Sequence, residues 1–264
     1  MDLYQMEGGY PLSGNVRIQG SKNAVLPMMA AALLQRGTVV FHHCPRIADV
    51  WCMEEILKSV GARTRWCRDS LLIDCSNIYS GEIPGAYADK MRSSVFLLGS
   101  FLPRYGQISI SYPGGCTIGR RPIDLHLAVL KALGVEIYED SCGLHARAGK
   151  LTGCRYCFPR ISVGATENAV MAAVVAAGVT CLSNCAREPE IIHLCHFLRA
   201  MGARIKGEGT GEILIKGVCR LHPAEFSVPS DRIVAGTYLF AGAATRGKVA
   251  LESAPVEEME AVLG

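Results

Sequence analysis

The sequence predicts an α/β protein built from copies of a repeat about seventy residues long. The first observation is a glycine that ends an apolar helix pattern and is followed at once by a strand pattern. It recurs as Gly37, Gly106, Gly178 and Gly247. The second observation is a further helix pattern, which ends at Gly61, Gly134 or Gly202. Glycine directly after a helix is a frequent C-terminal stop, so both sets of glycines mark helix ends.

The strands of each copy are short apolar runs. Those after the first glycines are residues 38–41, 107–110, 179–182 and 248–251, and those after the second glycines are residues 71–73, 143–146 and 213–215. The helices between them show apolar residues three and four apart, as in Leu127, Leu130 and Leu133. Each copy is therefore a βαβαββ-type repeat, which is too small to bury its apolar faces alone.

Three complete repeats predict one domain over residues 21–229, with residues 1–20 and 230–264 forming an incomplete second domain. The first twenty residues are expected to supply a strand to this second domain, and residues 256–263 a helix. By the spacing of the other copies, the fourth repeat lacks its second glycine. We therefore expect either a fragment of a longer protein or a separate short product, with self-association through the incomplete domain as one outcome.

Composition narrows the class of protein. Half of the 264 residues are apolar and the net charge is +3, which argues against a disordered protein and against a nucleic-acid partner. The amino terminus lacks the basic start and apolar run of a signal peptide. The longest small-apolar stretches, residues 24–34 and 169–179, are too short to span a bilayer. These features predict a cytoplasmic protein without a membrane partner.

Twelve cysteines are scattered over the chain. One CxxC pair, Cys154 and Cys157, has no second pair to complete a four-thiolate site, and His193 and Cys195 are two apart on a predicted helix. A zinc site is therefore not favoured, and we expect neither a metal nor a cofactor. Most of these thiols are expected to be small buried apolar groups.

The segment 113–125 is the strongest candidate for chemistry. It places Cys116 after two glycines and ahead of Arg120 and Arg121, and Asp124 follows at a helix start. A thiol near positive charge ionises more easily, and the thiolate is the reactive form. From Gly106 to Cys116 is ten residues, against seven from Gly37 to Cys44 and from Gly178 to Cys185. Only the second repeat lengthens this turn, which favours function over a stray cysteine in a surface turn.

The predicted helix starts form a second set. Lys22 and Asn23, Arg92, Ser162 and Asp231 stand at corresponding openings. The N–H groups of a helix start attract phosphate or carboxylate, and Lys22, Arg92, Arg121 and Arg160 add full charges. A solvated cap remains the plain alternative for Lys22 alone. Together, these residues predict a site for a multiply anionic ligand.

Four segments carry a resemblance to a known family: residues 20–24, 113–126, 162–166 and 186–190. On these segments the chain resembles the enolpyruvyl transferases, in particular those that act on UDP-N-acetylglucosamine. The resemblance runs along the whole chain. It implies an inside-out α/β barrel of two domains with a cleft between them. It also implies transfer of the enolpyruvyl group of phosphoenolpyruvate to the 3′-hydroxyl of UDP-N-acetylglucosamine with release of phosphate, the first committed step of peptidoglycan synthesis.

The resemblance also implies roles for residues. Cys116 becomes the general acid, which can form an adduct with phosphoenolpyruvate. Lys22 and Asn23 contact phosphoenolpyruvate and the sugar, and Arg92 and Arg121 assist at the anionic groups. The nucleotide-sugar contacts are Arg121, Pro122, Ile123, Asp124 and Leu125, together with Arg160, Ile161, Ser162 and Val163. Arg160 stands where the family commonly has lysine, which keeps the charge.

Three alternatives stay open at this point. Family members complete the second domain with further repeats, which supply an aspartate and several arginines that this chain does not contain. The chain could therefore be a UDP-sugar-binding paralogue without turnover, or it could complete its cleft with another polypeptide. The shikimate-pathway enolpyruvyl transferase is a weaker alternative, because it lacks the loop cysteine and the segment 121–124.

Overall fold

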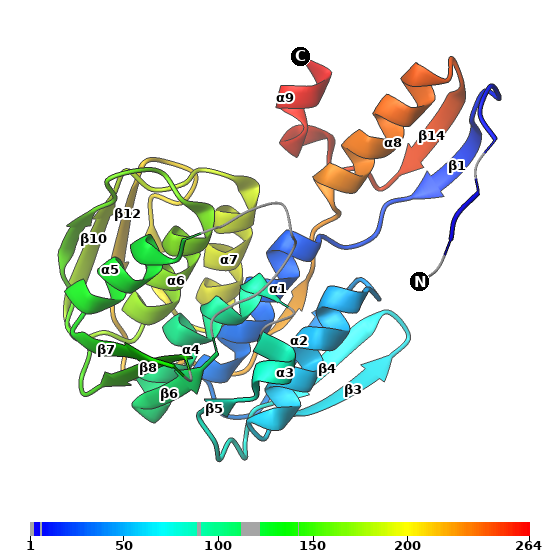
Figure 1. Cartoon of the computed structure of the whole chain (residues 1–264). Coiled ribbons are helices and arrows are strands. Elements are labelled where there is room, and N and C mark those ends of the chain that lie inside the picture. The colour runs from blue at the N-terminus through cyan, green and yellow to red at the C-terminus, as the bar shows by residue number, and fades with distance from the viewer. Residues whose placement is uncertain (1–2, 6, 89–90, 112–121, 142) are drawn as a thin grey trace. The chain divides into compact units, whose positions relative to one another are not determined.

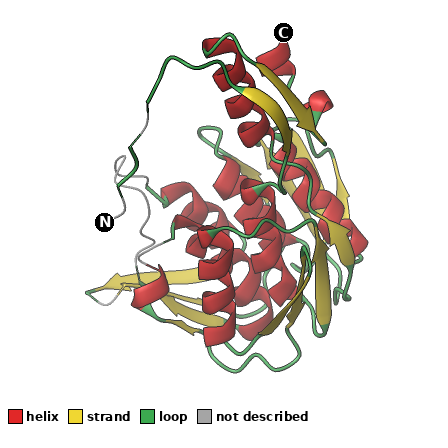
Figure 2. Ribbon diagram, turned by 90° about the vertical axis from the view of Figure 1, so that its right-hand side faces the viewer, coloured by secondary structure: helices red, strands yellow, loops and turns green. Residues whose placement is uncertain are grey.

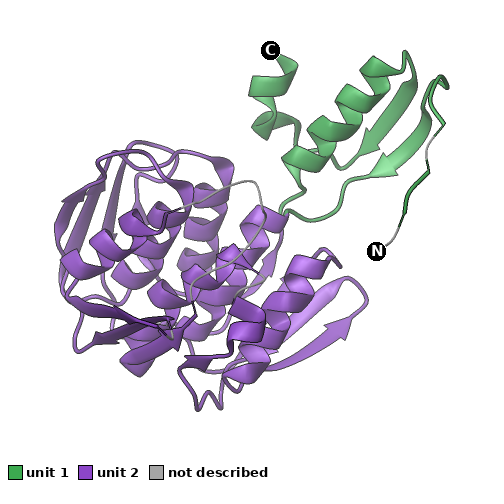
Figure 3. Cartoon of the chain, viewed as in Figure 1, with its two compact units in different colours: residues 1–21, 229–264 green, residues 22–228 purple. Residues whose placement is uncertain are grey.

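The structure is a computed structural model that describes residues 3–5, 7–88, 91–111, 122–141 and 143–264. The chain divides into two compact units (Figure 3). Unit 1 comprises residues 1–21 and 229–264, and unit 2 comprises residues 22–228. In the described part of the chain, every helix is too short or too polar to cross a membrane.

Unit 2 holds three repeats in chain order. The first contains α1 (Lys22–Ala31), η1 (Ala32–Leu34), β2 (Thr38–His42), α2 (Ala48–Ser59), β3 (Arg63–Cys67) and β4 (Ser70–Asp74). The second contains β5 (Glu82–Ile83), α3 (Gly85–Ala88), η2 (Arg92–Val95), α4 (Phe96–Tyr105), β6 (Gln107–Ile110), α5 (Asp124–Ala132), β7 (Val135–Asp140) and β8 (Gly143–Ala148). The third contains β9 (Arg155–Cys157), α6 (Val163–Ala173), β10 (Val179–Ser183), α7 (Pro189–Ala200), β11 (Arg204–Lys206), β12 (Glu212–Lys216) and β13 (Glu225–Ser227).

The strands form three four-stranded sheets with the same pattern. Their orders are β13-β2-β4-β3, β5-β6-β8-β7 and β11-β12-β10-β9. In each sheet the strand that follows the first helix pairs antiparallel with the second strand of the hairpin, and parallel with one short linking strand. The linking strands β5 and β9 come directly after the preceding repeat. The third, β13, returns to the first sheet, where Glu225 pairs with Val40, so the three repeats close in a ring.

The helices fill the interior of unit 2, and the sheets lie outside them (Figures 1 and 2). Residues 24–31 of α1 and 165–173 of α6 are all buried. Buried residues alternate with half-buried ones in β4 and with exposed ones in β12, so these sheets have one face on the core and one toward water. This arrangement agrees with the inside-out α/β architecture that the sequence resemblance implied.

Unit 1 is smaller. It contains β1 (Ser13–Arg17), α8 (Arg232–Ala244), β14 (Lys248–Glu252), η3 (Val256–Glu258) and α9 (Glu260–Leu263). Strand β1 pairs parallel with β14 over Ser13 to Arg17, as expected of a strand within the first twenty residues. The expected helix over 256–263 is interrupted at Met259, where η3 ends and α9 has not begun.

The glycines that end the helices differ in backbone conformation between the two units. In unit 2 the six helix-ending glycines all have positive φ, from +79° at Gly106 to +131° at Gly37, a region that side chains disfavour. At the corresponding helix end in unit 1, after α8, the left-handed conformation is taken by Arg246, with φ 52°. Gly247 follows it, and a Cβ there would lie 1.9 Å from the carbonyl oxygen of Leu12. Gly247 is therefore required by close backbone approach and not by its φ.

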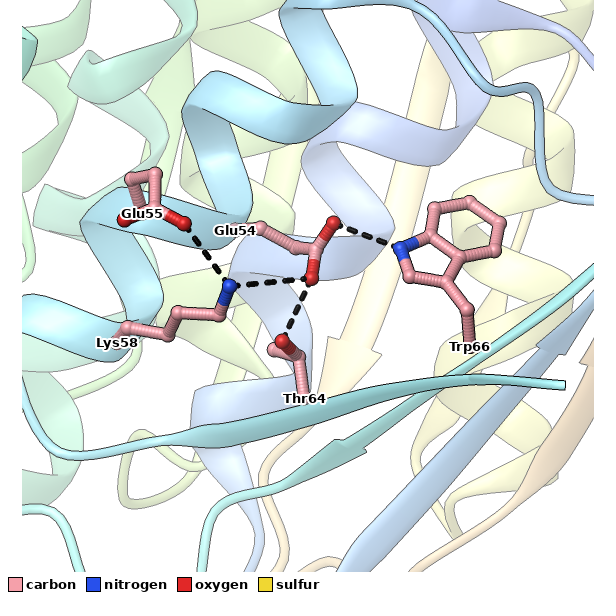
Figure 4. A network of polar contacts seen from close by, with 5 residues as sticks. All are labelled: Glu54, Glu55, Lys58, Thr64 and Trp66. Atoms are coloured by element: carbon pink, nitrogen blue, oxygen red, sulfur yellow. Dashed lines mark hydrogen bonds and ion pairs between the residues drawn. The ribbon is translucent and has the colours of Figure 1, made fainter.

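A polar network in the first repeat fastens α2 to its hairpin (Figure 4). Glu54 is 5% exposed and accepts hydrogen bonds from Trp66 Nε1 at 2.8 Å and Thr64 Oγ1 at 2.6 Å. Lys58 Nζ lies 3.6 Å from Glu54 and 2.9 Å from Glu55. A buried carboxylate is tolerated only with such partners, so this network positions β3 against α2.

Candidate functional site

The predicted site residues of the second and third repeats stand at three helix starts. Arg92 is the first residue of η2, Asp124 is the first of α5, and Val163 is the first of α6. Pro122 and Ile123 precede α5, and Leu125 is buried within it. Arg160 and Ile161 are exposed, and they lead into Ser162, whose Oγ caps α6 by accepting from the N–H of Ala165 at 3.4 Å.

Hydrogen bonds join these three helix starts. Arg92 Nη2 donates to the carbonyl oxygen of Pro122 at 3.2 Å. Arg160 Nη2 lies 2.8 Å from both carboxylate oxygens of Asp124. The Arg160–Asp124 pair is about half exposed on both sides, and pairs of this kind contribute roughly 0–1 kcal/mol to stability. The Arg160–Asp124 pair therefore adds little stability, and its main effect is to hold the start of α6 beside the start of α5.

Buried polar groups lie directly behind these starts. His126 is 3% exposed, and burial, followed by the nearby charge of Arg92, lowers its pKa to about 4. Tyr156 also belongs to this neighbourhood, since burial and then the Asp124 carboxylate raise its pKa. His126 is therefore neutral at physiological pH, and the charged side chains that the structure describes at these three helix starts are those of Arg92, Asp124 and Arg160.

Lys22 and Asn23 occupy the first two positions of α1. Lys22 is partly buried and Asn23 is exposed. The Nζ of Lys22 lies 3.8 Å from Asp49 in the first turn of α2, so this ion pair belongs to the helix starts of the first repeat. Cys116 and Arg121, the predicted reactive thiol and the second arginine of its segment, lie outside the described residues.

The described cysteines set a background for thiol chemistry. Burial raises the pKa of Cys44, Cys75 and Cys195 to about 12 and that of Cys185 to about 11, so these thiols stay protonated and unreactive. Cys67, Cys157 and Cys219 are exposed. In the part of the chain that the structure describes, no group of three or more His, Cys, Asp or Glu residues could hold a metal ion.

Sequence reasoning passed over His126, Asn168 and Glu167. All three are buried polar residues within helices that are otherwise apolar. That interruption was the only signal available, because the partners of His126 and Asn168 come from another repeat: Nδ2 of Asn168 lies 3.0 Å from Nδ1 of His126. Glu167 is 2% exposed, and its Oε1 has no hydrogen-bond partner among the described residues. Burial, and then the charges of Glu190 and Glu188, raise the pKa of Glu167 well above its usual value.

Solved structures share this architecture. The enolpyruvyl transferase NikO from Streptomyces tendae matches with a TM-score of 0.76 at 24% identity, over 88% of this chain and 55% of that one. An EPSP synthase from Acinetobacter baumannii matches with a TM-score of 0.73 at 21% identity, over 94% of this chain and 57% of the other. The fold is therefore that of the enolpyruvyl transferases.

The sequence profile of the EPSP synthase (3-phosphoshikimate 1-carboxyvinyltransferase) family matches residues 6–263. The chain belongs to this family. Among curated relatives, UDP-N-acetylglucosamine 1-carboxyvinyltransferase 2 of Caldanaerobacter subterraneus is 44% identical over 100% of this chain and 63% of its own length. The UDP-N-acetylglucosamine 1-carboxyvinyltransferase of Rickettsia bellii is 49% identical over 93% of this chain and 60% of its own length. The chain thus spans less than two thirds of the length of these relatives.

Proposed function

We propose that the chain takes part in catalysis of enolpyruvyl transfer from phosphoenolpyruvate to the 3′-hydroxyl of UDP-N-acetylglucosamine, with release of phosphate. The observation that carries the proposal is 44% identity, over the whole chain, to a protein named UDP-N-acetylglucosamine 1-carboxyvinyltransferase 2. The proposed reaction is a cytoplasmic step of peptidoglycan synthesis, which supplies the cell wall. Both substrates are small molecules, and the proposed chemistry uses no cofactor.

The proposed roles follow the chemistry of the groups. Protonation of the methylene carbon of phosphoenolpyruvate needs a positioned acid, which we assign to Cys116. Lys22 and Asn23 contact phosphoenolpyruvate and the sugar, and Arg92 and Arg121 neutralise anionic groups. The segments 121–125 and 160–163 bind the nucleotide. A fixed cage of charges lowers the barrier because it needs no rearrangement as charge develops.

The described geometry supports the nucleotide part of this proposal. Two segments about thirty-five residues apart in the sequence, at Asp124 and Arg160, are joined by a carboxylate–guanidinium pair. The start of α6 adds the N–H groups of Val163 and Gly164, for which no described residue is an acceptor. Guanidinium groups and the N–H groups of a helix start at one place favour a phosphate-bearing ligand.

A second candidate function is binding of the nucleotide sugar without turnover. The observation that favours it is the length difference, because the chain spans 63% of a relative 44% identical to it. Two measurements separate the candidates. Phosphate release after mixing with both substrates supports enolpyruvyl transfer, whereas calorimetric binding of UDP-N-acetylglucosamine without phosphate release supports the binding function.

The nucleotide segment is tested by calorimetry with UDP-N-acetylglucosamine. Arg160→Ala and Arg121→Ala should each weaken binding by about ten-fold or more, because each removes a hydrogen bond to a charged group worth roughly 1.5–3 kcal/mol. Arg204→Ala is the matched control, since Arg204 is exposed on β11. Equal affinity in all four proteins would contradict the assignment.

The thiol assignment is tested by limiting iodoacetamide and peptide mapping of the folded protein. Cys116 should be labelled first, because a thiol beside two arginines ionises most readily. The competitors are the exposed Cys67, Cys157 and Cys219. A Cys67→Ser, Cys219→Ser background is the control. Faster labelling of Cys157 than of Cys116 would overturn the assignment.

A further inference from the structure

A serine, a histidine and an aspartate form a hydrogen-bonded row on the second sheet of unit 2. Ser109 lies on β6, His145 on β8, and Asp140 is the last residue of β7. Oγ of Ser109 is 2.9 Å from Nδ1 of His145, and Nε2 of His145 is 3.1 Å from Oδ1 of Asp140. This is the order of hydroxyl, imidazole and carboxylate that serves nucleophilic catalysis on unrelated folds. The ring is turned so that Nδ1 and not Nε2 faces the hydroxyl, which leaves the order of groups unchanged.

The pairing of the strands places these side chains together. Ser109 is directly opposite His145 in the β6–β8 ladder, and Tyr138 is directly opposite His145 in the β7–β8 ladder. Residues directly opposite each other share one face of a sheet. The neighbours of Ser109 along β6, Ile108 and Ile110, are buried. Ser109 and His145 therefore lie on the outer face of the sheet, away from the core of unit 2.

The imidazole of His145 is held in one orientation and one tautomer. The ring of Tyr138 stacks on it, with the ring centres 4.9 Å apart and the planes 14° apart. Oδ1 of Asp140 accepts from the N–H of Gly143 at 3.2 Å, which fixes the carboxylate in its turn. A carboxylate only accepts, so Nε2 of His145 donates to it, and Nδ1 of the neutral ring is an acceptor. The hydroxyl of Ser109 then donates to Nδ1, as a nucleophile donates to its general base.

A surface cavity of about 380 Å³ opens at this row. Ser109 and His145 line it, together with Gln107, Arg147 and the exposed Tyr79. Gln107 and Arg147 are opposite each other in the β6–β8 ladder, two residues from the Ser109–His145 pair. Cavities of about 300–1,000 Å³ hold small molecules. A small ester can therefore reach the hydroxyl, with amide and guanidinium N–H donors in the same cavity.

The first sheet of unit 2 carries a comparable row, which provides an internal control. Oγ of Ser70 is 3.0 Å from Nδ1 of His42, and Nε2 of His42 is 3.2 Å from Oε2 of Glu225. The side chain of His42 is 46% exposed, whereas that of His145 is 19% exposed and lines the cavity. The two rows share their hydrogen bonds and differ in enclosure, and a site that excludes water strengthens the electrostatic interactions within it.

We propose that Ser109 is the nucleophile of a second active site, which hydrolyses small carboxylic esters. Oγ of Ser109 bonds to the ester carbonyl carbon while its proton passes to Nδ1 of His145. The bond to the alcohol oxygen then breaks, and the alcohol leaves with that proton. Water attacks the acyl-serine and gives a proton to Nδ1, and the carboxylic acid leaves as Ser109 regains the proton. Arg147 and Gln107 supply N–H donors for the oxyanion, and Asp140 is a positioning residue that acts through His145.

Hydrolysis of p-nitrophenyl acetate by the full chain tests the proposal. Ser109→Ala and His145→Gln should each lower kcat/KM by about 10²-fold or more, because each removes a group that takes part in the bond changes. Ser70→Ala is the matched control and should keep the rate of the wild type. A rate that Ser109→Ala retains, or that Ser70→Ala loses equally, would overturn the proposal.

A fluorophosphonate probe tests the nucleophile in the wild type, without any variant. An activated serine attacks the phosphorus and expels fluoride, so peptide mapping should find the phosphonyl group on Ser109. Ser70 offers the comparison within the same sample, because it has the same hydrogen bond to a histidine. Absence of the group from Ser109, or equal labelling of Ser70, would overturn the proposal.

The role of Asp140 is tested through the tautomer of His145. Long-range ¹H–¹⁵N spectra should show the Nε2–H tautomer in the wild type, and Asp140→Asn should reduce its population. The same variant should lower kcat/KM for the ester by about ten-fold or more, because a carboxylate partner selects the tautomer that accepts from the serine. An Nδ1–H tautomer in the wild type would overturn the proposal, since such a ring cannot take the proton of Ser109.

Discussion

Unit 2 and unit 1 share the helix–strand pattern but differ in what it buries. In unit 2 one continuous apolar cluster runs through all three repeats and includes every central helix. In unit 1 the buried apolar cluster consists of Ile18, Ala235 and Met259, while Ile233 and Phe240 on α8 are 52% and 64% exposed. The repeat therefore becomes stable by packing against neighbouring repeats and not by its own local pattern.

The largest expected difference is in hydrogen exchange. Amides of α1 and α6 should exchange through opening of the whole of unit 2, while those of α8 open locally because so little apolar surface covers them. The rates should differ by roughly three orders of magnitude or more, given unfolding free energies above about 5 kcal/mol for an ordinary domain. Mass spectrometry of the monomeric chain measures this. Equal protection through residue 264 would mean that unit 1 is stable by itself.

The second largest expected difference is in the effect of truncating a core side chain on the free energy of unfolding. Phe197 is fully buried and lies 5.1 Å from Phe41 and 5.6 Å from Phe226, ring to ring. Phe197→Ala should therefore lower the free energy of unfolding by about 3–5 kcal/mol in urea. Met259→Ala in unit 1 should leave that transition unchanged. A shift of the same size from both variants would show that the two units unfold together.

Acid should destabilise unit 2 through His126. Its folded pKa of about 4 lies below its unfolded value of about 6.5, so the unfolded state binds more protons between these values. The stability contributed by neutral His126 is complete above pH 6.5 and declines by about 2–4 kcal/mol as the pH falls to 4. Urea titrations of the wild type and His126→Gln measure the slope. Unit 1 contains no histidine, so its unfolding should lack this dependence.

Glu167 should give the stability of unit 2 the opposite pH dependence, with a loss as the pH rises. Its folded pKa is raised, so the folded state holds the proton more tightly than the unfolded state. The resulting stability is present at low pH and is lost as the pH rises above about 4.5 toward the folded pKa. Glu167→Gln should therefore be more stable than the wild type at pH 8, by about 1 kcal/mol or more. A variant that is less stable at pH 8 would contradict the burial of an uncharged acid.

The smallest expected effect on folding comes from Phe240. Because its side chain is 64% exposed, Phe240→Ser should change the stability of unit 2 by less than about 0.5 kcal/mol. The same substitution should reduce concentration-dependent association, since exposed apolar surface promotes contacts between chains. Sedimentation velocity over a range of concentrations measures this. Unchanged association would show that the chains do not associate through Phe240 on α8.

The repeat pattern could be read from the sequence because it is local. The glycine after each helix and the apolar run that follows it lie within a few residues of one another, and the observed β2, β6, β10 and β14 begin where this pattern placed them. The linking strands were missed. Strand β5 has only two residues and β13 has three, which is too short for any periodicity. The hairpin strand β3 carries Arg63 and Arg65 and offers only a weak apolar alternation.

The candidate site, too, could be predicted from the sequence only in part. The helix starts at Lys22, Arg92, Val163 and Arg232 were predictable, because capping residues and charge precede each apolar run. The contacts between them were not. Arg160 and Asp124 are in different repeats, and so are His126 and Asn168. Their pairing depends on how the helices of neighbouring repeats pack, and no short-range signal in the sequence contains that information.

The return of β13 to the first sheet has a consequence for synthesis of the chain. Strand β2 is complete at His42, yet its parallel neighbour begins at Glu225, so one edge of the first sheet stays open until nearly the whole of unit 2 has left the ribosome. Closing so long a loop is slow, because its entropy is lost before the pairing is gained. Nascent chains that stop before Glu225 are therefore expected to bind chaperones through the open edge of β2.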